Sequence, residues 1–407
     1  MKHASKRFRA GWYAAMAAGL VVAGCGSSAS KVSSATTAAT ASANAVPSSL
    51  LGLPVYKSLI QPPAQLLAAA YKGLYTAPPT TGPKAVKGKD LWVISCGQSS
   101  TSCQLPTASL VAAAKAAGWS THVVDGQLNP VLWAQGITQA VAGGASGVIA
   151  VSVDCNNATT ALSQAKAAHV LTESYEGFDC NDPGVNAGPS LFSTAVGYHG
   201  APNIGAYFEE WGASRAAWVI NATHGQAKVV DLGIPSILSI KYEDVGFLAE
   251  MSQCSGCKVV DDVPIALTDL ATNAASQKLS TALEQHPEAN AVNIPSDSFF
   301  PQFVNSVLSS INRPSLQVMG GECLTANLTE IANGGPEDAC SALPDVWNGW
   351  AAVDEMNRQF ANPGSAPVDE GLSIQLVDKA HNMPSGGQGW APTGVNIPQA
   401  YTSLWNG

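Results

Sequence analysis

From Asp90 onward, short apolar segments alternate with longer helical patterns, and this alternation limits the possible folds more than any other feature of the sequence. The stretch GVIAVSV (147–153) suits a strand that is buried on both faces. In the first half, strand-like segments occur at 91–95, 121–125, 147–153 and 170–174, with helical patterns between them. Such alternation predicts a parallel sheet with helices on both faces.

The pattern starts again near residue 203. A helical segment at 204–220 is followed by strand-like segments at 227–233, 257–263, 289–294 and 315–320. The fold class is therefore predicted as α/β, with two Rossmann-like lobes that each contain a parallel sheet. Because ligands of open α/β sheets bind beyond the carboxyl ends of the strands, two facing lobes would form a ligand cleft.

The N-terminus has the pattern of an export signal. Residues 11–23 are apolar and follow a basic start, but they are too few for a span of about 20 residues. The segment 22–25 resembles the lipobox of bacterial lipoproteins, which makes Cys25 the expected lipidated residue. Residues 27–45 are a polar, small-residue tether that cannot form a core. We expect an extracytoplasmic protein that is attached to the membrane only through its lipid.

Charge argues against nucleic-acid binding. Cleavage after residue 24 removes four of the 20 Lys and Arg residues and none of the 29 acids, which leaves a net charge of −13. Such a chain repels phosphate backbones.

The cysteine count favours disulfides over metal sites. Eight cysteines remain besides Cys25, and an even number in an exported chain indicates disulfide bonds. No metal or other cofactor is predicted.

Six stretches match those of a known family in order and spacing. They are NPVLWAQGITQAVAGGASGVIAVSVD (129–154), AHVLTESYEG (168–177), NIGAYFEEWGASRAAWVI (203–220), QHPEANAVNIPSDSFFPQFVNSVL (285–308), LQVMGGECLTANLTEIANGG (316–335) and DACSALPDVWNGWAAVDEMNRQF (338–360). Over roughly residues 86–405, the chain resembles the type I periplasmic substrate-binding proteins of the ribose-binding-protein-like branch. This branch serves sugar ABC transporters.

The resemblance implies a hinge at which the chain crosses between the lobes three times, near Asn203, Ala342 and Leu372. The expected organisation is a signal peptide at 1–24, a lipidated tether and extension at 25–85, a first lobe at 86–203 plus 343–372, and a second lobe at 204–342 plus 373–407. The implied partners are a sugar-like small molecule and the permease subunits of an ABC transporter, and we expect a monomer.

The resemblance also places candidate ligand residues at the ends of strands. In the first lobe these are Gln98, Ser99, Tyr175 and Glu176, and in the second lobe they are Lys241, Ser296, Asp297 and Glu322. Tyr175 would stack on a sugar's C–H face. Lys241 and Glu322 would hold the ligand from one wall, or would pair with each other. Asp297 is a ligand residue or a helix cap.

Asp154 follows the strand at 147–153 and precedes a helical segment. Aspartate is a preferred N-cap because its carboxylate accepts hydrogen bonds from free backbone N–H groups. We therefore expect a capping role for Asp154 rather than direct ligand contact.

Two other functions are compatible with parts of the sequence. Ser163 and Lys166 fit the S-x-x-K pattern, and Ser296-Asp297-Ser298 resembles the S-D-N element of penicillin-recognising enzymes, but no K-T-G follows. No catalytic residue is therefore predicted. A ligand sensor that signals to a membrane receptor would use the same fold as a transport protein, and the sequence leaves this alternative open.

The predicted lobes also restrict the disulfides, because a bridge between lobes would lock the hinge. We expect bonds between sequence neighbours, namely Cys96–Cys103, Cys155–Cys180, Cys254–Cys257 and Cys323–Cys340.

Overall fold

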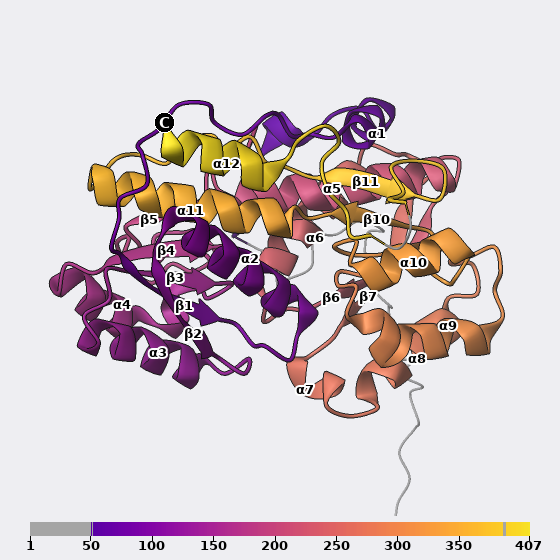
Figure 1. Ribbon diagram of the computed structural model, residues 1–407. Helices are drawn as coiled ribbons and strands as arrows, with labels where there is room; N and C mark the ends of the chain where they lie inside the picture. The colour runs from indigo at the N-terminus through magenta and orange to yellow at the C-terminus, as the bar shows by residue number, and fades with distance from the viewer. Residues whose placement is uncertain (1–49, 51, 386–387) are drawn as a thin grey trace, which may run out of the picture. The chain divides into compact units, whose positions relative to one another are not determined.

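Two β-sheets, each covered by helices, organise the computed structural model, which describes residues 50, 52–385 and 388–407 (Figure 1). The expected signal peptide, the lipidated Cys25 and the tether at 27–45 lie outside the described residues. Within the described residues, no helix has the length and apolar character needed to cross a membrane.

The first sheet is parallel throughout and has the strand order β2-β1-β3-β4-β5. Its strands are β1 (Asp90–Ser95), β2 (Ser120–Asp125), β3 (Gly147–Val151), β4 (Leu171–Tyr175) and β5 (Thr194–Ala195). Every residue of β3 is buried, as expected for a central parallel strand. The helices of this lobe are α2 (Thr101–Ala117), α3 (Pro130–Ala142), α4 (Thr159–Ala167) and α11 (Asp345–Ala361), with the short 3-10 helix η3 (Cys155–Asn157).

The second sheet has the order β11-β10-β9-β8-β6-β7 and is parallel except for the β10–β11 pair. Its strands are β6 (Lys228–Gly233), β7 (Lys258–Pro264), β8 (Ala291–Asn293), β9 (Gln317–Met319), β10 (Ala339–Ala342) and β11 (Gln375–Asp378). Its helices are α5 (Ile204–Ala222), α6 (Leu238–Met251), α7 (Leu267–Leu270), α8 (Ala274–Gln285), α9 (Asn305–Ile311), preceded by the π-helical turn η4 (Phe300–Val304), and α10 (Thr325–Asn333). The two sheets confirm the predicted fold class.

Helices α5 and α6 pack unusually closely through two glycines. A Cβ atom at Gly212 would overlap the carbonyl oxygen of Glu243, and one at Gly246 would overlap the carbonyl oxygen of Glu209. This contact fixes the first turn of α6, which carries the candidate Lys241.

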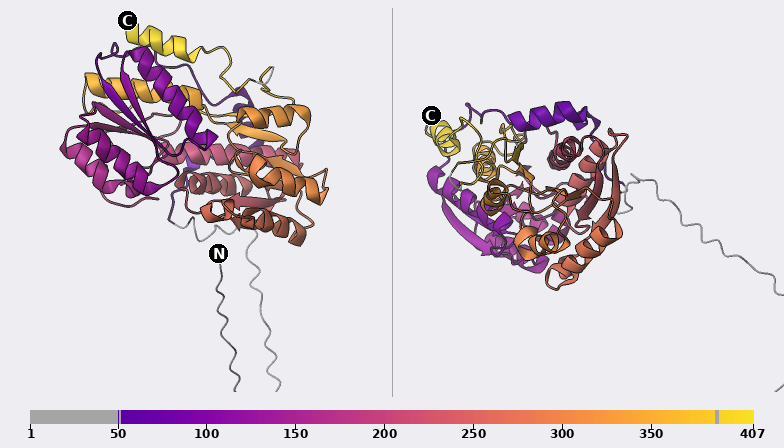
Figure 2. Two further views of the ribbon diagram at one scale, coloured as in Figure 1. Left: turned by 60° about the horizontal axis from the view of Figure 1, so that its bottom comes forward. Right: turned by 90° about the vertical axis from the view of Figure 1, so that its right-hand side faces the viewer.

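The chain passes between the sheets after β5, after β10 and before β11. The C-terminal helix α12 (Ile397–Asn406) differs from the expectation that residues 373–407 belong to the second lobe. It packs against α11 and α2 of the first lobe, and Figure 1 and Figure 2 both show it beside α11. Buried Tyr401 and Trp405 anchor it there, since the Trp405 indole donates to Asp354 Oδ1 of α11 at 2.6 Å. The chain therefore returns to the first lobe once more than predicted.

The segment before β1 is part of the folded unit. Its helix α1 (Pro63–Lys72) packs on α5 and β11, and it buries Leu66, Leu67 and Ala70 (Figure 2). The backbone N–H of Leu74 donates to the carbonyl of Ile374 at 2.9 Å, beside the last predicted crossing.

The same segment then reaches the first lobe. The Ala85 N–H donates to the Trp405 carbonyl at 3.0 Å, and Arg358 Nη2 of α11 donates to the Thr81 carbonyl at 3.0 Å. Residues 53–85 thus contact both lobes across the hinge.

The four predicted disulfides are confirmed. Cys96–Cys103 and Cys155–Cys180 lie in the first lobe, whereas Cys254–Cys257 and Cys323–Cys340 lie in the second. None of these bonds joins the two lobes.

Candidate functional site

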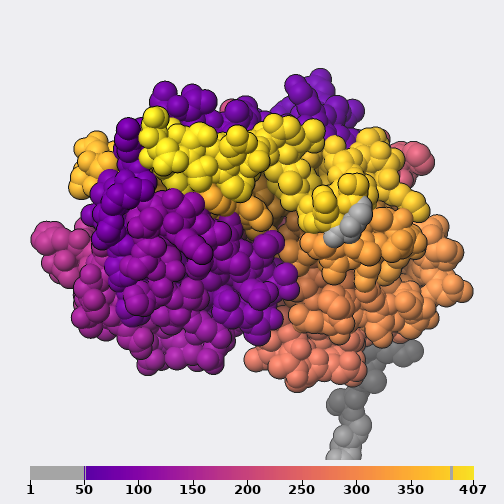
Figure 3. Space-filling model, viewed as in Figure 1, coloured from indigo at the N-terminus to yellow at the C-terminus, as the bar shows by residue number. Residues whose placement is uncertain are grey.

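Strand ends from both sheets carry most of the predicted ligand residues. Tyr175 is the last residue of β4 and Glu176 follows it, Ser296 and Asp297 follow β8, and Glu322 follows β9. These are the carboxyl ends of parallel strands, where open α/β folds bind their ligands. Below the yellow C-terminal segment in Figure 3, the surfaces of the two lobes meet.

The carboxylate of Glu322 accepts hydrogen bonds from both lobes. Its Oε1 accepts from Ser102 Oγ of α2 in the first lobe at 3.3 Å, and from Ser296 Oγ at 3.2 Å. Its Oε2 accepts from the Asp297 backbone N–H at 2.7 Å. Glu322 is therefore held at a point where the lobes touch.

Asp297 shapes the loop that carries Glu322. Its fully buried carboxylate accepts from the N–H groups of Gly321 and Leu324, each at 2.6 Å. Leu324 precedes α10, so the carboxylate binds the start of a different helix rather than capping the one that follows Asp297 in sequence. Asp297 positions Glu322.

Glu176 contacts the start of α11. Asn348 Nδ2 donates to Glu176 Oε1 at 2.9 Å and to the hydroxyl of Tyr198 at 3.2 Å. Asn348 is fully buried, and its Oδ1 has no hydrogen-bond partner. The ring of Tyr198 stacks on that of Tyr207 with centroids 4.0 Å apart, and the buried Tyr207 hydroxyl also has no partner. Two side chains of this group, Asn348 and Tyr207, thus each carry a buried polar atom without a partner.

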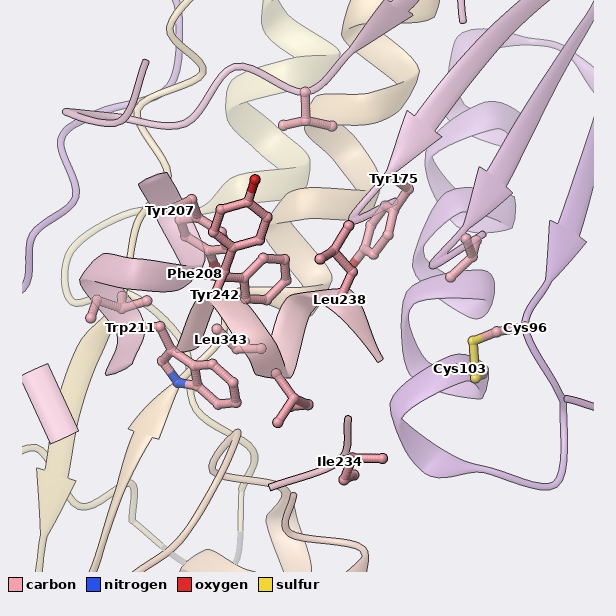
Figure 4. Packing of buried hydrophobic residues seen from close by; sticks show 14 of the residues in the cluster. Cys96, Cys103, Tyr175, Tyr207, Phe208, Trp211, Ile234, Leu238, Tyr242 and Leu343 are labelled. Carbon is pink, nitrogen blue, oxygen red and sulfur yellow. A yellow bond between two sulfur atoms is a disulfide. The ribbon is translucent and has the colours of Figure 1, made fainter. Parts of the chain in front are cut away.

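Tyr175 is fully buried, and its hydroxyl donates to the backbone carbonyl of Asp345 at 3.5 Å. Figure 4 shows its ring at the end of its strand. Stacking on a sugar would require its ring to become exposed when the lobes separate, and this role stays a prediction.

Four acidic side chains around the contact between Ser102 and Glu322 form what we call the interlobe acidic cluster: Glu176, Asp297, Glu322 and Asp345. Burial is the main cause that raises the pKa of each carboxyl group, to about 7 for Glu176 and about 8 for Asp297. Repulsion within the cluster adds to the rise, because the charge of Glu322 acts on Glu176, Asp297 and Asp345. The raised pKa values favour the protonated acids near neutral pH, so a ligand that contacts these groups meets hydrogen-bond donors as well as acceptors.

Lys241 lies apart from this cluster. In the described part of the chain, no ion pair joins Lys241 to Glu322. Its charge acts instead on Asp154. Burial raises the pKa of Asp154 to about 7, and the charge of Lys241 partly offsets this rise. Of the two alternatives for these residues, pairing of Lys241 with Glu322 is not found among the described residues, and a ligand role for each stays a prediction.

The capping role expected for Asp154 is wrong. The carboxylate makes no capping bond to η3, and its Oδ1 accepts from the Phe178 N–H at 3.1 Å. Asp154 thus ties the end of β3 to the loop after β4. Phe178 stacks on Tyr242 of α6 with centroids 5.1 Å apart, so Asp154 also supports a second contact between the lobes.

Gln98 and Ser99 follow β1, at the carboxyl end of a strand of the first sheet. Gln98 Nε2 donates to Ser95 Oγ at 2.6 Å, and Ser99 is exposed. Ser163 and Lys166 of the S-x-x-K pattern are both exposed on α4, and Lys166 Nζ donates to the Ser190 carbonyl at 3.0 Å. This geometry gives Ser163 no base that would activate it.

Sequence reasoning missed Ser102, Tyr198, Tyr207, Asp345 and Asn348. Ser102 lies within the loop that the Cys96–Cys103 disulfide closes. Its hydroxyl, on the first turn of α2, donates to Glu322 of the other lobe. Asp345 and Asn348 are three residues apart at the start of α11, directly after a crossing. Their position next to the hinge was the one available signal.

A family model described as periplasmic binding protein domain matches residues 93–362, which include Ser102, Glu176 and Glu322. The chain belongs to the periplasmic binding protein family. Membership in this family implies an extracytoplasmic location. Among curated proteins, none matches the sequence.

Solved structures show the same type I two-lobe fold as this periplasmic binding protein. An ABC transporter solute-binding protein from Mycobacterium smegmatis, with bound glycerol, has a TM-score of 0.61 at 19% identity and covers 75% of this chain and 100% of its own. One from Burkholderia graminis C4D1M, in complex with D-arabinose, has a TM-score of 0.61 at 20% identity, with coverages of 74% and 99%. One from Agrobacterium vitis, with bound allitol, has a TM-score of 0.58 at 13% identity, with coverages of 72% and 96%.

Proposed function

We propose that this protein is a lipid-anchored solute-binding protein that captures a small polyhydroxylated ligand, a sugar or sugar-like compound, between its lobes. It then delivers the ligand to the permease of an ABC transporter without altering it chemically. Cys25 would carry the lipid, and the protein would act as a monomer.

The observation that carries this proposal is the hydrogen bond between Ser102 of the first lobe and Glu322 of the second, at 3.3 Å. It places a carboxylate acceptor where the lobes close. Ligand hydroxyls can donate to that carboxylate, and hydrogen bonds to charged acceptors are stronger than neutral ones. A ligand that binds between the lobes favours the closed state only through contacts made in that state.

The bound glycerol, D-arabinose and allitol of the structural relatives support a polyhydroxylated ligand. A thermal-shift panel of pentoses, hexoses, furanosides and polyols tests the proposal, because a ligand that binds only the folded state raises its melting temperature. We expect a rise with one class of sugar or polyol, and the recovered ligand should be chemically unchanged. A panel without any shift, or conversion of the ligand that a mutation in the interlobe site abolishes, would overturn the proposal.

A further inference from the structure

The segment before β1 follows the hinge from one lobe to the other. It precedes the family match, which begins at residue 93, and we call its residues 53–86 the hinge strap. Figure 1 shows the hinge strap along the top of the molecule, with α1 over the second lobe and the chain after α1 passing toward the first. The hinge strap therefore lies where its contacts affect the relative position of the lobes.

One end of the hinge strap binds the first crossing between the lobes. The Tyr56 hydroxyl accepts from Asn203 Nδ2 at 2.7 Å, and the Tyr56 N–H donates to Glu209 Oε2 at 2.8 Å. Asn203 is the N-cap of α5, because its Oδ1 accepts from the Ala206 N–H at 2.9 Å. Tyr56 thus holds the side chain that starts the first helix after the crossing.

The hinge strap also pairs with the backbone of the last crossing, just before β11. The Leu74 N–H donates to the Ile374 carbonyl at 2.9 Å, and the Thr76 N–H donates to the Gly371 carbonyl at 2.7 Å. A Cβ atom at Gly371 would overlap the carbonyl oxygen of Ala77. The backbone of the hinge strap therefore packs directly on the chain where it passes between the sheets.

Helix α1 anchors the hinge strap to the second lobe. Leu66 of α1 is fully buried in a cluster with residues of α5 and the second sheet. Asn382 Nδ2 and Gln375 Nε2 donate to the Tyr71 carbonyl at 2.7 and 3.1 Å. Because Gln375 is the first residue of β11, this anchor moves with the second sheet.

The other end of the hinge strap is anchored to the first lobe. Arg358 Nη2 donates to the Thr81 carbonyl at 3.0 Å, and the Val86 N–H donates to Asn357 Oδ1 at 2.9 Å. Asn357 is fully buried, and its Nδ2 donates to the Pro83 carbonyl at 3.2 Å. Arg358 and Asn357 both belong to α11, so this anchor moves with the first lobe.

The link between the two anchors is short and stiff. Only residues 77–80 separate Thr76, which is bonded at the last crossing, from Thr81, which is bonded to α11. The link includes Pro78 and Pro79, whose rings fix φ and make the segment a semi-rigid spacer. Since an extended residue spans at most about 3.6 Å, so short a link cannot absorb a large change in the spacing of its anchors. A rotation that moves α11 away from α1 therefore breaks contacts at one anchor.

All of these contacts are made in the arrangement in which Ser102 donates to Glu322 across the lobes. Contacts that exist in one arrangement and not in another shift the equilibrium toward the first. Resting on the proposed function, we propose that the hinge strap restrains separation of the lobes and holds the ligand-free protein close to its closed arrangement. The ligand then has less of the closure left to drive, and it is released more slowly.

Lengthening the link tests this proposal, because added residues uncouple the two anchors without removing either. The variant carries about six added Gly and Ser residues, a flexible linker, between the exposed Thr80 and Thr81. The matched control carries the same residues between Gly143 and Gly144, two exposed residues that follow α3 within the first lobe. Small-angle scattering of the two ligand-free proteins, which have equal mass, should give the larger mean radius of gyration for the insertion in the hinge strap.

A second pair of variants serves if an insertion prevents folding. Pro78→Gly combined with Pro79→Gly loosens the link without adding residues, and Pro363→Gly, at an exposed proline after α11, is its control. The loosened link should again give the larger radius of gyration. Equal radii within a folded pair, or a smaller radius for the hinge-strap variant, would overturn the inference.

Neither comparison uses a sugar, so the two proposals fail separately. A hinge strap without effect on the radius leaves the proposed function standing. A sugar and polyol panel without any thermal shift overturns the proposed function, whatever the radii of the variants are.

Discussion

Ser102 Oγ donates to Glu322 Oε1 at 3.3 Å, and this hydrogen bond joins helix α2 of the first lobe to the loop after β9 of the second. Glu322 is also held within the second lobe by the Asp297 backbone N–H at 2.7 Å, a bond that does not involve the first lobe. The contact therefore reports closure of the two lobes.

Removing the Ser102 hydroxyl should favour the open state. We expect Ser102→Ala to make closure less favourable by about 1 kcal/mol, the usual net value of one hydrogen bond. Small-angle scattering of the ligand-free protein should then give a larger mean radius of gyration. Ser99→Ala, at an exposed serine within the same Cys96–Cys103 loop, is the control. Equal radii for both variants would show that the contact does not hold the lobes together.

Helix α1 should contribute to stability although it lies outside the family match. Leu66 is fully buried between α1 and the second lobe, so Leu66→Ala should lower the free energy of unfolding by about 2–5 kcal/mol. Leu267→Ala makes the same change at a side chain that is 46% exposed, and it should cost less than about 0.5 kcal/mol. Denaturant unfolding measures both, and equal costs would mean that α1 is not docked.

The disulfides should differ in their contribution to stability. Cys155 and Cys180 are 25 residues apart, whereas Cys254 and Cys257 are 3 residues apart. In the chain-entropy model the longer loop contributes about 3.5 kcal/mol and the shorter about 2 kcal/mol. Chemical unfolding of the two double Cys→Ala variants should show the larger loss for Cys155 and Cys180. The reverse order would contradict this assignment.

The protein should lose stability as the pH rises from 5 to 8. Burial raises the pKa of Glu355 to about 8 and that of Glu210 to about 7, from an ordinary value of 4.5. The folded state therefore keeps protons that the unfolded chain releases above pH 4.5, so each unit of pH increase favours unfolding until the folded-state pKa is passed.

Melting temperatures across this range measure the effect. Glu355→Gln, which keeps an oxygen for the Val368 N–H, should give a flatter pH profile than the wild type, whereas the exposed Glu284→Gln should not. A wild-type melting temperature that rises between pH 5 and 8 would contradict the assigned direction.

The alternation of strands and helices was predictable because a buried strand such as β3 and an amphipathic helix such as α1 each follow from local patterns. The four disulfides followed from the lobe boundaries. The position of α12 could not be predicted, because nothing local in residues 397–406 distinguishes packing on α11 from packing on the second sheet.

Side-chain partners in the site were harder to predict than the strand ends that carry them. The carboxylate of Asp154 binds the Phe178 N–H rather than its own helix, and that choice depends on residues 24 positions apart. Lys241 lies on α6, whose position is fixed by Gly212 and Gly246, so its distance from Glu322 depends on helix packing rather than on its own sequence neighbours.

Calorimetric titration of Glu322→Ala and Lys241→Ala with the sugar that stabilises the wild type tests most directly whether ligand binds where the lobes meet. Glu322→Ala should weaken binding by about 1.5–3 kcal/mol, as expected for a lost hydrogen bond to a charged group, with the fold's stability little changed. Lys241→Ala should weaken it less, because Lys241 acts on Asp154. An affinity of Glu322→Ala equal to that of the wild type would contradict a ligand site at the Ser102–Glu322 contact.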